Sequence, residues 1–163
     1  MNIRPIDIQK DRQKLLEFHC VTNYESSDPA LRKAYTSEQY REIWIRSHGP
    51  EEFLSALAKS MKDSRTIVEF WENGGSIIAY VWVTFTDWPE YNATGAEISD
   101  ILVVPEFQRR GIATQVIKHV EELACKRGAT LLRSGTGSEN VASQELHAKL
   151  GFQTYRVEFE KEL

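Results

Sequence analysis

Cysteines and long apolar runs are scarce in this chain of 163 residues. The two cysteines, Cys20 and Cys125, form no C-x-x-C pair, and no His or Cys stands at zinc-ligand spacing. This argues against a disulfide framework and predicts no metal site. The first residues lack the apolar core of a signal peptide, and no run approaches the roughly 18 apolar residues of a membrane span. We therefore expect a cytoplasmic protein with reduced thiols and no membrane partner.

Positive charge is also in short supply. The formal net charge of −4 argues weakly against a broad nucleic-acid-binding surface. The one basic patch is Arg109 with Arg110. We therefore expect no nucleic-acid partner. If the protein did bind nucleic acid through Arg109 and Arg110, its affinity would depend steeply on salt concentration.

Repeats, low-complexity tracts and linkers rich in Pro, Gly or Ser are absent. Together with the chain length, this predicts a single domain over residues 1–163. Signatures of other enzyme classes are missing too. Gly135 and Gly137 begin a G-x-G-x-x-G pattern, but Asn140 stands where the third glycine is required, and there is no Walker A or G-x-S-x-G motif.

The apolar periodicity predicts strands and helices in alternation along most of the chain. Strands are expected over 3–6, 65–72, 76–88, 96–104, 129–137 and 152–163. Helices are expected after Asp7 to about Thr22, after Thr36 through Trp44, from Pro50 through Met61, from Ile112 to Gly128 and over 142–151. This order predicts an α/β sandwich around a mixed sheet.

Local signals fix several of these boundaries. Asp7 is expected to be a helix N-cap, Thr36 with Gln39 is expected to form a capping box, and Asn73-Gly74-Gly75 predicts a hairpin turn. The segment 23–35 combines turn residues with apolar ones, so it is either a structured loop or a short broken helix.

The joint between the strand 96–104 and the next helix carries a glycine and two arginines. The start of a helix presents unpaired backbone N–H groups and a partial positive charge, which suits an anion. Gly111 lets a phosphate approach the backbone, Ala113 keeps the next turn small, and Arg109 and Arg110 add positive charge. The alternative is that both arginines are solvated and that Gly111 only makes a turn.

Two segments resemble the GNAT superfamily of N-acetyltransferases. "ILVVPEFQRRGIATQVI" resembles its acyl-CoA signature Q/R-x-x-G-x-G/A, with Gln108, Gly111 and Ala113 at the fixed positions. "SENVASQELHAKLGF" resembles the later segment N-x-x-A/S-x-x-L-Y-x-x-x-G-F at Asn140, Ser143, Leu146, Gly151 and Phe152. The resemblance implies an α/β (α+β) sandwich whose mixed, mostly antiparallel sheet is splayed at the cofactor site. Residues 22–65 and the C-terminal strand region match the family only in placement.

The resemblance also implies acetyl-CoA as cosubstrate. Backbone groups of Ile101 and Val103 would pair with the pantetheine arm, amides from Arg109 to Thr114 would hold the diphosphate, and Asn140 with Ser143 would contact the cofactor from the other side. For Asn140, a plain helix N-cap is the alternative. The implied cofactor-binding residues are Ile101, Leu102, Val103, Gln108, Arg109, Arg110, Gly111, Ile112, Ala113, Thr114, Asn140 and Ser143.

Acyl transfer to an amine needs an oxyanion donor and a proton acceptor. The resemblance puts the thioester beside the N–H of Val103, which is therefore the expected donor, and Glu97 is the expected base, acting through water. Glu97 and Asp100 point to opposite faces of a strand unless a bulge intervenes, so we expect at most one to face the cleft. The strand at 131–135 offers no acid, which leaves the base open, and both carboxylates are alternatively ordinary surface groups.

His147 stands where the family commonly has a tyrosine that protonates the leaving thiolate. An imidazole can serve as this acid near neutral pH. Alternatively, His147 is a polar residue on a helix face, or the thiolate leaves without an acid.

The acceptor is poorly specified by the sequence. The residues Tyr24, Tyr35, Trp88 and Tyr91, with nearby Glu25, Asp28, Asp87 and Glu90, are candidates for a cleft that attracts a cationic amine, or else are packing residues. The prediction is an N-acetyltransferase acting on a small-molecule or peptide amine, with a possible homodimer through the final strand. The alternative is a CoA-binding regulatory or sensor module without turnover.

Overall fold

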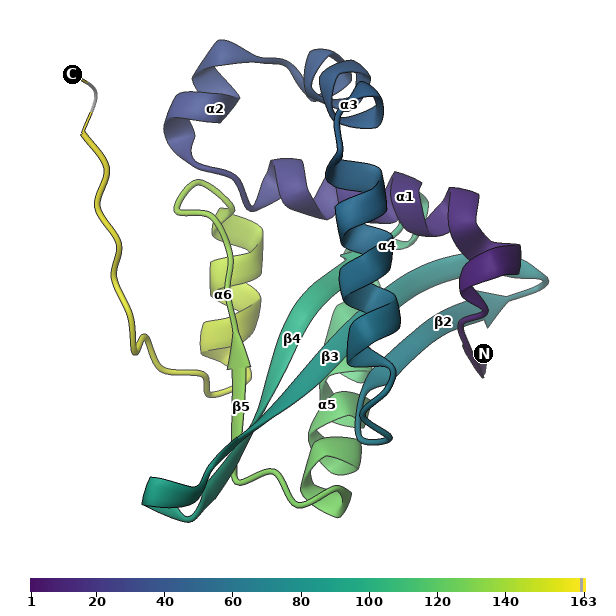
Figure 1. The fold of residues 1–163 in the computed structure, drawn as a ribbon, viewed down its shortest axis with the longest axis vertical. Helices are drawn as coiled ribbons and strands as arrows, with labels where there is room; N and C mark the ends of the chain where they lie inside the picture. Colours follow the sequence, from purple (N-terminus) through teal and green to yellow (C-terminus); the bar gives the residue numbers. More distant parts are fainter. Residues whose placement is uncertain (162) are drawn as a thin grey trace.

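The computed structural model describes residues 1–161 and 163 and contains a five-stranded sheet. The strands lie in the order β1-β2-β3-β4-β5, and every neighbouring pair is antiparallel except β4 and β5, which are parallel (Figure 1). Their bounds are β1 Asn2–Pro5, β2 Ile67–Asn73, β3 Ser76–Trp88, β4 Ala93–Val103 and β5 Leu131–Ser134. The expected mixed, mostly antiparallel sheet is confirmed.

Six α-helices and two short 3₁₀ turns complete the described part of the chain. The helices are α1 Ile8–Glu25, α2 Pro29–Ala34, α3 Ser37–Arg46, α4 Gly49–Ser60, α5 Ile112–Lys126 and α6 Val141–Lys149, and the 3₁₀ turns cover Pro89–Tyr91 and Pro105–Phe107. Of the two alternatives for 23–35, the short helix is confirmed by α2. Helix α1 runs one turn past its expected end at Thr22.

The predicted helix starts are confirmed by their hydrogen bonds. The Asp7 carboxylate accepts from the backbone N–H groups of Gln9 and Lys10, and Thr36 exchanges both capping-box bonds with Gln39. Such caps satisfy N–H groups that have no partner inside the helix, so each contributes about 1 kcal/mol. Local chemistry therefore determines where these helices begin.

Helices cover the two faces of the sheet in separate layers. Figure 1 shows α4 in front of the sheet, α1 crossing its upper end, and α5 behind it. Buried residues of α5 such as Val116, Ile117 and Val120 pack with Val81 and Ile98 of the sheet. On the other face, α1, α3 and α4 pack on Phe70, Tyr80 and Trp82. Each face thus has its own apolar core.

The sheet opens between β4 and β5. Pairing between these two strands covers only 95–98 against 131–134, whereas β4 continues to Val103 along β3. The register of β3 and β4 also shifts, because Trp82 is opposite Asp100 while Val83 is opposite Ile98, which leaves Ser99 as an extra residue. The expected splay of the sheet is confirmed at this place.

The strand expected over 152–163 is not formed in the described residues 152–161, which have no regular secondary structure; residue 162 lies outside the described residues. The prediction rested on alternation, but the apolar side chains of this segment find no face to cover. Val157 is 65% exposed and Phe159 is 93% exposed. The segment is attached by Tyr155, whose ring lies against Arg133, and by Glu160, which accepts from the Ala30 N–H. Without a buried face, alternation alone does not stabilise a strand.

None of the described helices combines the length and apolar character needed to cross a membrane.

Candidate active site

The free side of β4 is determined by its hydrogen-bond register with β3. Val104 donates its N–H to the Ile78 carbonyl at 2.9 Å. In an antiparallel pair, alternate residues direct both backbone groups to the partner strand. Ile101 and Val103 therefore direct their backbone groups away from β3, towards the opening that β5 leaves beyond Ile98. This is the arrangement expected for residues that pair with an extended ligand.

Gln108 binds one of these backbone groups, the carbonyl of Val103. Its side-chain amide donates to the Val103 carbonyl at 2.9 Å, so it joins the turn to the end of β4. The Val103 N–H is the group that points into the opening. Leu102 directs its backbone to β3, and its side chain packs on the face of α1 and α4. Leu102 can therefore contact a ligand in the opening through its side chain but not through its backbone.

The turn that follows β4 leads into α5 with two residues in the left-handed region. Arg109 has φ 61° and Gly111, the N-cap of α5, has φ 77°. The N-cap makes no side-chain hydrogen bond, so the first amides of α5 carry no protein cap. A Cβ placed on Gly111 would meet no protein atom within 4 Å. The space above this glycine is open to a ligand, and uncapped amides at a helix start suit an anion.

The predicted cradle residues lie together around this helix start. Arg109 and Arg110 are exposed, and the Arg110 guanidinium lies 5.3 Å from the centre of the Phe107 ring. Ile112 anchors the helix in the core, while Ala113 and Thr114 remain half-buried on its first turn. The cradle therefore offers backbone N–H groups and two cations at one surface position.

Helix α6 brings the second predicted segment to the other side of the opening. The Asn140 side chain accepts from the Ser143 N–H at 3.2 Å, so Asn140 is the N-cap of α6. Nδ1 of His147 lies 2.7 Å from the Ser143 carbonyl, and because a carbonyl only accepts, Nδ1 carries the hydrogen. Its Nε2 is buried without a partner, as is Oγ1 of Thr136 on the loop after β5. Two unpaired polar atoms on this side fit a ligand with polar groups of its own.

The bulge decides where the two carboxylates of β4 point. Glu97 alternates with Ala96 and Ile98, which pack under α5, so Glu97 faces the α1 side. Asp100 also faces α1, because it is bound by His19 and Thr22. The two carboxylates were expected on opposite faces unless a bulge intervened; the bulge is present, and both lie on the same face of the strand. Glu97 is exposed, whereas Asp100 is only 7% exposed.

Asp100 is the centre of a hydrogen-bond network that the sequence did not reveal. Its carboxylate lies 2.6 Å from Nδ1 of His19 and accepts from the hydroxyls of Thr22 at 2.9 Å and Tyr80 at 3.4 Å. Burial, together with the charge of Asp100, raises the pKa of Tyr80 well above its usual value, so its hydroxyl stays a donor. The only sequence signal for this network was that His19 and Thr22 are polar residues among the apolar residues of α1. Many helices carry such polar residues, so the pattern did not indicate the network.

The aromatic residues proposed to line an acceptor cleft do not meet. Tyr24 and Tyr35 lie at α1 and α2, whereas Trp88 and Tyr91 lie at the far end of the β3–β4 connection (Figure 1). The Trp88 ring covers Gly95, where a Cβ would come within 2.3 Å of it, and the same ring carries the Arg133 guanidinium at 4.3 Å. These four aromatic residues therefore lie in two separate parts of the molecule and do not line one cleft. For Trp88, the alternative of a packing role is confirmed.

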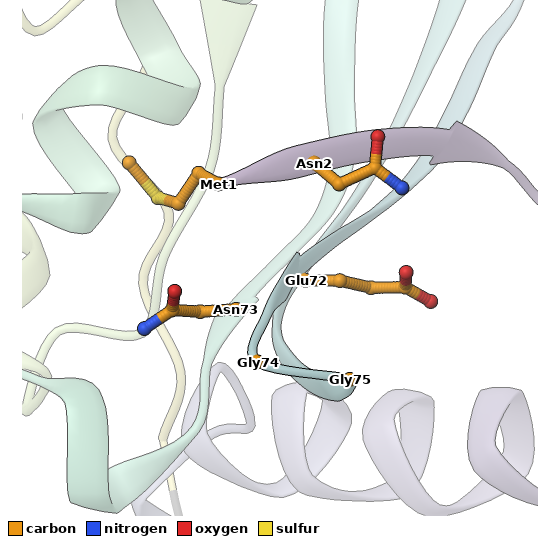
Figure 2. Close-up of a pocket in the computed structure, with 6 residues that line it drawn as sticks. All are labelled: Met1, Asn2, Glu72, Asn73, Gly74 and Gly75. Carbon is orange, nitrogen blue, oxygen red and sulfur yellow. The ribbon is translucent and has the colours of Figure 1, made fainter.

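A hollow of about 370 Å³ lies elsewhere, between the N-terminus and the β2–β3 turn (Figure 2). Its one carboxylate, Glu72, accepts a hydrogen bond from Arg4 at 2.7 Å. Backbone and amide groups make up much of the remainder of its lining, which contains Asn2, Asn73 and two glycines. None of the candidate residues lines this hollow, whereas they gather at the opening beside β4, which is the candidate active site.

Two known acetyltransferases are similar to part of this chain. An aminoglycoside N(6')-acetyltransferase type 1 of Salmonella typhimurium is 40% identical over 63 residues, which are 38% of this chain and 43% of the relative. A thialysine N-epsilon-acetyltransferase of Mus musculus is 27% identical over 82 residues, 50% of this chain and 48% of the relative. The matched stretch thus spans less than half the length of these relatives.

Solved structures share the whole fold. An aminoglycoside antibiotic 6'-N-acetyltransferase from Acinetobacter haemolyticus aligns with a TM-score of 0.67 at 20% identity, covering 100% of this chain and 99% of that one. A transcriptional regulator from Bacillus halodurans aligns with a TM-score of 0.69 at 20% identity, covering 99% of both chains. The model of the acetyltransferase (GNAT) family matches residues 24–152. The chain therefore belongs to the GNAT family of acetyltransferases.

Proposed function

We propose that this protein transfers the acetyl group of acetyl-CoA to a primary amine of a small molecule or peptide, by direct attack in a ternary complex. The observation that carries the proposal is the continuity of the donor site. The free backbone groups of Ile101 and the free N–H of Val103 lead along β4 to the uncapped start of α5 at Gly111. A strand edge for an amide-containing arm thus ends at an anion site for a diphosphate.

Each residue of the donor site has a proposed task. Ile101 pairs with the arm through its backbone, Val103 directs its N–H to the thioester end of the arm, and Leu102 contacts the arm with its side chain. The amides from Arg109 to Thr114, with the two arginine charges, hold the diphosphate, and Gln108 fixes the turn to Val103. Asn140 and Ser143 border the arm from α6. As the N-cap of α6, Asn140 positions this border in addition to any contact of its own.

The chemistry requires one new bond and one broken bond. The lone pair of the amine forms a bond to the thioester carbon, the carbonyl oxygen becomes an oxyanion, and collapse breaks the C–S bond and leaves a thiolate. The Val103 N–H donates to the oxyanion. Glu97 accepts a proton through water, and His147 donates one to the thiolate. For His147 this requires a proton on Nε2, the nitrogen that is buried without a partner.

The acceptor is proposed to be a small cationic amine. Several relatives are named aminoglycoside N(6')-acetyltransferases, and one solved neighbour was crystallised with a bisubstrate analogue of CoA and acetylneamine. The net charge of −4 favours the approach of a cation. The single domain, the cytoplasmic location and the lack of a nucleic-acid partner stay predictions. The homodimer also stays a prediction, but the final strand on which it was based is not formed in residues 152–161.

The test is the release of free thiol from acetyl-CoA, measured with a chromogenic thiol reagent. The acceptor panel contains aminoglycosides, polyamines, amino acids and peptides with free N-termini. Release that depends on an added amine supports the proposal and identifies the acceptor class. Tight binding of CoA with no release across the panel would favour the alternative, a sensor module that binds CoA without turnover.

A further inference from the structure

The buried carboxylate of Asp100 has no task in the donor site, although it directly precedes Ile101. Thr22 and Asp100 are the buried polar side chains of the described residues, and they bind each other at 2.9 Å. A buried carboxylate is costly unless its oxygens accept hydrogen bonds. Here three donors from α1 and β3 satisfy it, and the donor with the shortest contact is His19 at 2.6 Å. The network therefore fixes the orientation of an imidazole beside β4.

The His19 ring is held in one place with one nitrogen free. It stacks on Phe53 of α4 at 3.8 Å between ring centres, with 6° between the planes, and Trp44 of α3 lies 5.8 Å away. Because the carboxylate accepts, Nδ1 carries the hydrogen and the neutral ring keeps its lone pair on Nε2. No described residue binds Nε2, and Nε2 is not among the polar atoms buried without a partner. The side chain is 17% exposed, so solvent or a ligand can reach the ring.

The reaction needs more than one proton acceptor. A primary ammonium ion, with a pKa near 10 in its lysine form, is protonated at neutral pH and must lose one proton before its lone pair can attack. The adduct loses a second proton from nitrogen before the amide forms. One of the two protons ends on the thiolate and the other in solvent. Glu97 was assigned to only one of these transfers.

We propose that His19, oriented by Asp100, accepts one of the two protons that the amine nitrogen loses. This assignment rests on the proposed N-acetyltransferase function. In the step, an N–H bond of the acceptor breaks, its electron pair stays on nitrogen, and the proton forms a new bond to Nε2. The resulting imidazolium is stabilised by the Asp100 carboxylate and returns its proton to water. A carboxylate that holds an imidazole in the correct tautomer is a known means of preparing a general base.

The surroundings of His19 leave Asp100 as its main electrostatic partner. Tyr80 of β3 faces the same carboxylate and has a pKa raised well above its usual value. Phe53 and Trp44 present uncharged rings. The neighbouring thiol of Cys20 has a pKa raised by burial and lowered in part by Arg41 of α3. Asp100 is therefore the charged group that contacts the His19 ring among these neighbours.

The test compares His19→Gln with the wild-type protein. The glutamine amide can still donate to Asp100 but cannot accept a proton. We expect kcat/KM to fall by roughly 100-fold or more, with one ionisation lost from its pH profile and with unchanged affinity for acetyl-CoA. His48→Gln is the matched control, since His48 is exposed before α4 and should leave the rate unchanged.

Two further variants separate catalysis from structure. His19→Ala should regain at least about tenfold in rate when free imidazole is added, because the base is then supplied from solution. Asp100→Asn, assayed where it is folded and binds acetyl-CoA, should lose the same ionisation. Loss of acetyl-CoA affinity in His19→Gln, or a lack of imidazole rescue, would show a structural role and overturn the assignment.

The outcomes for His19 and for the function are distinguishable. If the wild-type protein releases thiol with an amine and His19→Gln does so equally well, only the assignment of His19 fails. If the wild-type protein releases none across the acceptor panel, the proposed function fails and the assignment fails with it.

Discussion

The two faces of the sheet are built from different chemistry. The face under α5 is packed with aliphatic side chains such as Ile98 and Ile117, and its proposed ligand groups are backbone amides at the helix start. The face under α1 and α4 carries aromatic rings and the buried pair of Thr22 and Asp100. The first face positions its part of the site through aliphatic packing, which depends on side-chain volume. The second face positions its part through hydrogen bonds, which depend on the identity of each donor and acceptor atom.

This difference separates the two halves of the proposed site, the donor half that binds acetyl-CoA and the acceptor half that receives the amine. The donor half uses backbone groups, which every residue has, so a short motif with a glycine is enough to specify it. The acceptor half uses side chains from α1, β3 and β4, which must be brought together by the fold. The predictions below test whether the two halves respond to different kinds of substitution.

Gly111→Glu is expected to have the largest effect. It adds bulk and negative charge where the anion should lie, so affinity for acetyl-CoA should fall by roughly 100-fold or more, about 3 kcal/mol. Isothermal titration of acetyl-CoA measures this. Gly128→Glu is the matched control, because Gly128 is also left-handed with open space above it, but follows the other end of α5. Equal losses of acetyl-CoA affinity in both variants would show that backbone strain causes the loss and would contradict the assignment of Gly111 to the anion site.

Asp100→Asn against Ile117→Val compares the two faces directly. The asparagine keeps the size but places an NH₂ group where the network supplies donors, which should cost about 2–3 kcal/mol of unfolding free energy. Ile117, fully buried, loses one methylene in the valine variant and should cost about 1 kcal/mol. Urea unfolding gives both values. A smaller cost for Asp100→Asn than for Ile117→Val would contradict the distinction between the faces.

His147→Phe should separate turnover from binding on the α6 side. The phenyl ring can keep the edge-to-face contact with Phe152, which has a centre distance of 4.9 Å, but it cannot donate a proton. We expect kcat to fall roughly 10- to 100-fold while acetyl-CoA affinity changes little. Steady-state kinetics with the best amine of the panel tests this. Kinetics equal to the wild type would end the acid role.

Asp11→Asn should have the smallest effect and concerns a partly buried ion pair at the start of α1. Hydrogen bonds from Arg4 hold the pKa of Asp11 below its usual value, with Arg4–Asp11 contacts of 2.8 and 2.9 Å. Such a carboxylate adds stability above its unfolded pKa of about 3.9, and this stability is lost as pH falls through the lower folded value. The wild type should therefore lose more stability than the variant between pH 6 and about pH 3, by under about 1 kcal/mol. Asp28→Asn is the control, since Asp28 makes no side-chain cap bond. Parallel pH curves for wild type and Asp11→Asn would contradict this.

What the sequence determined by itself is local. The capping box at Thr36, the hairpin at Asn73-Gly74-Gly75 and the turn at Gly111 form as expected, because each depends on residues a few positions apart. The order of the elements and the donor side of the site follow from such segments. Alternation failed for residues 152–161, because a strand also needs a face to cover, which no local pattern supplies.

What only the tertiary structure decided is the acceptor half. The bulge at Ser99, which turns both Glu97 and Asp100 to the α1 face, depends on how β3 and β4 pair. The contact of His19 with Asp100 joins residues 81 positions apart, and nothing in either local segment indicates the partner. Backbone groups at a helix start are specified wherever a helix starts, whereas a side-chain network exists only where distant elements pack together. This is the physical reason why the donor cradle is visible in the sequence and the buried network is not.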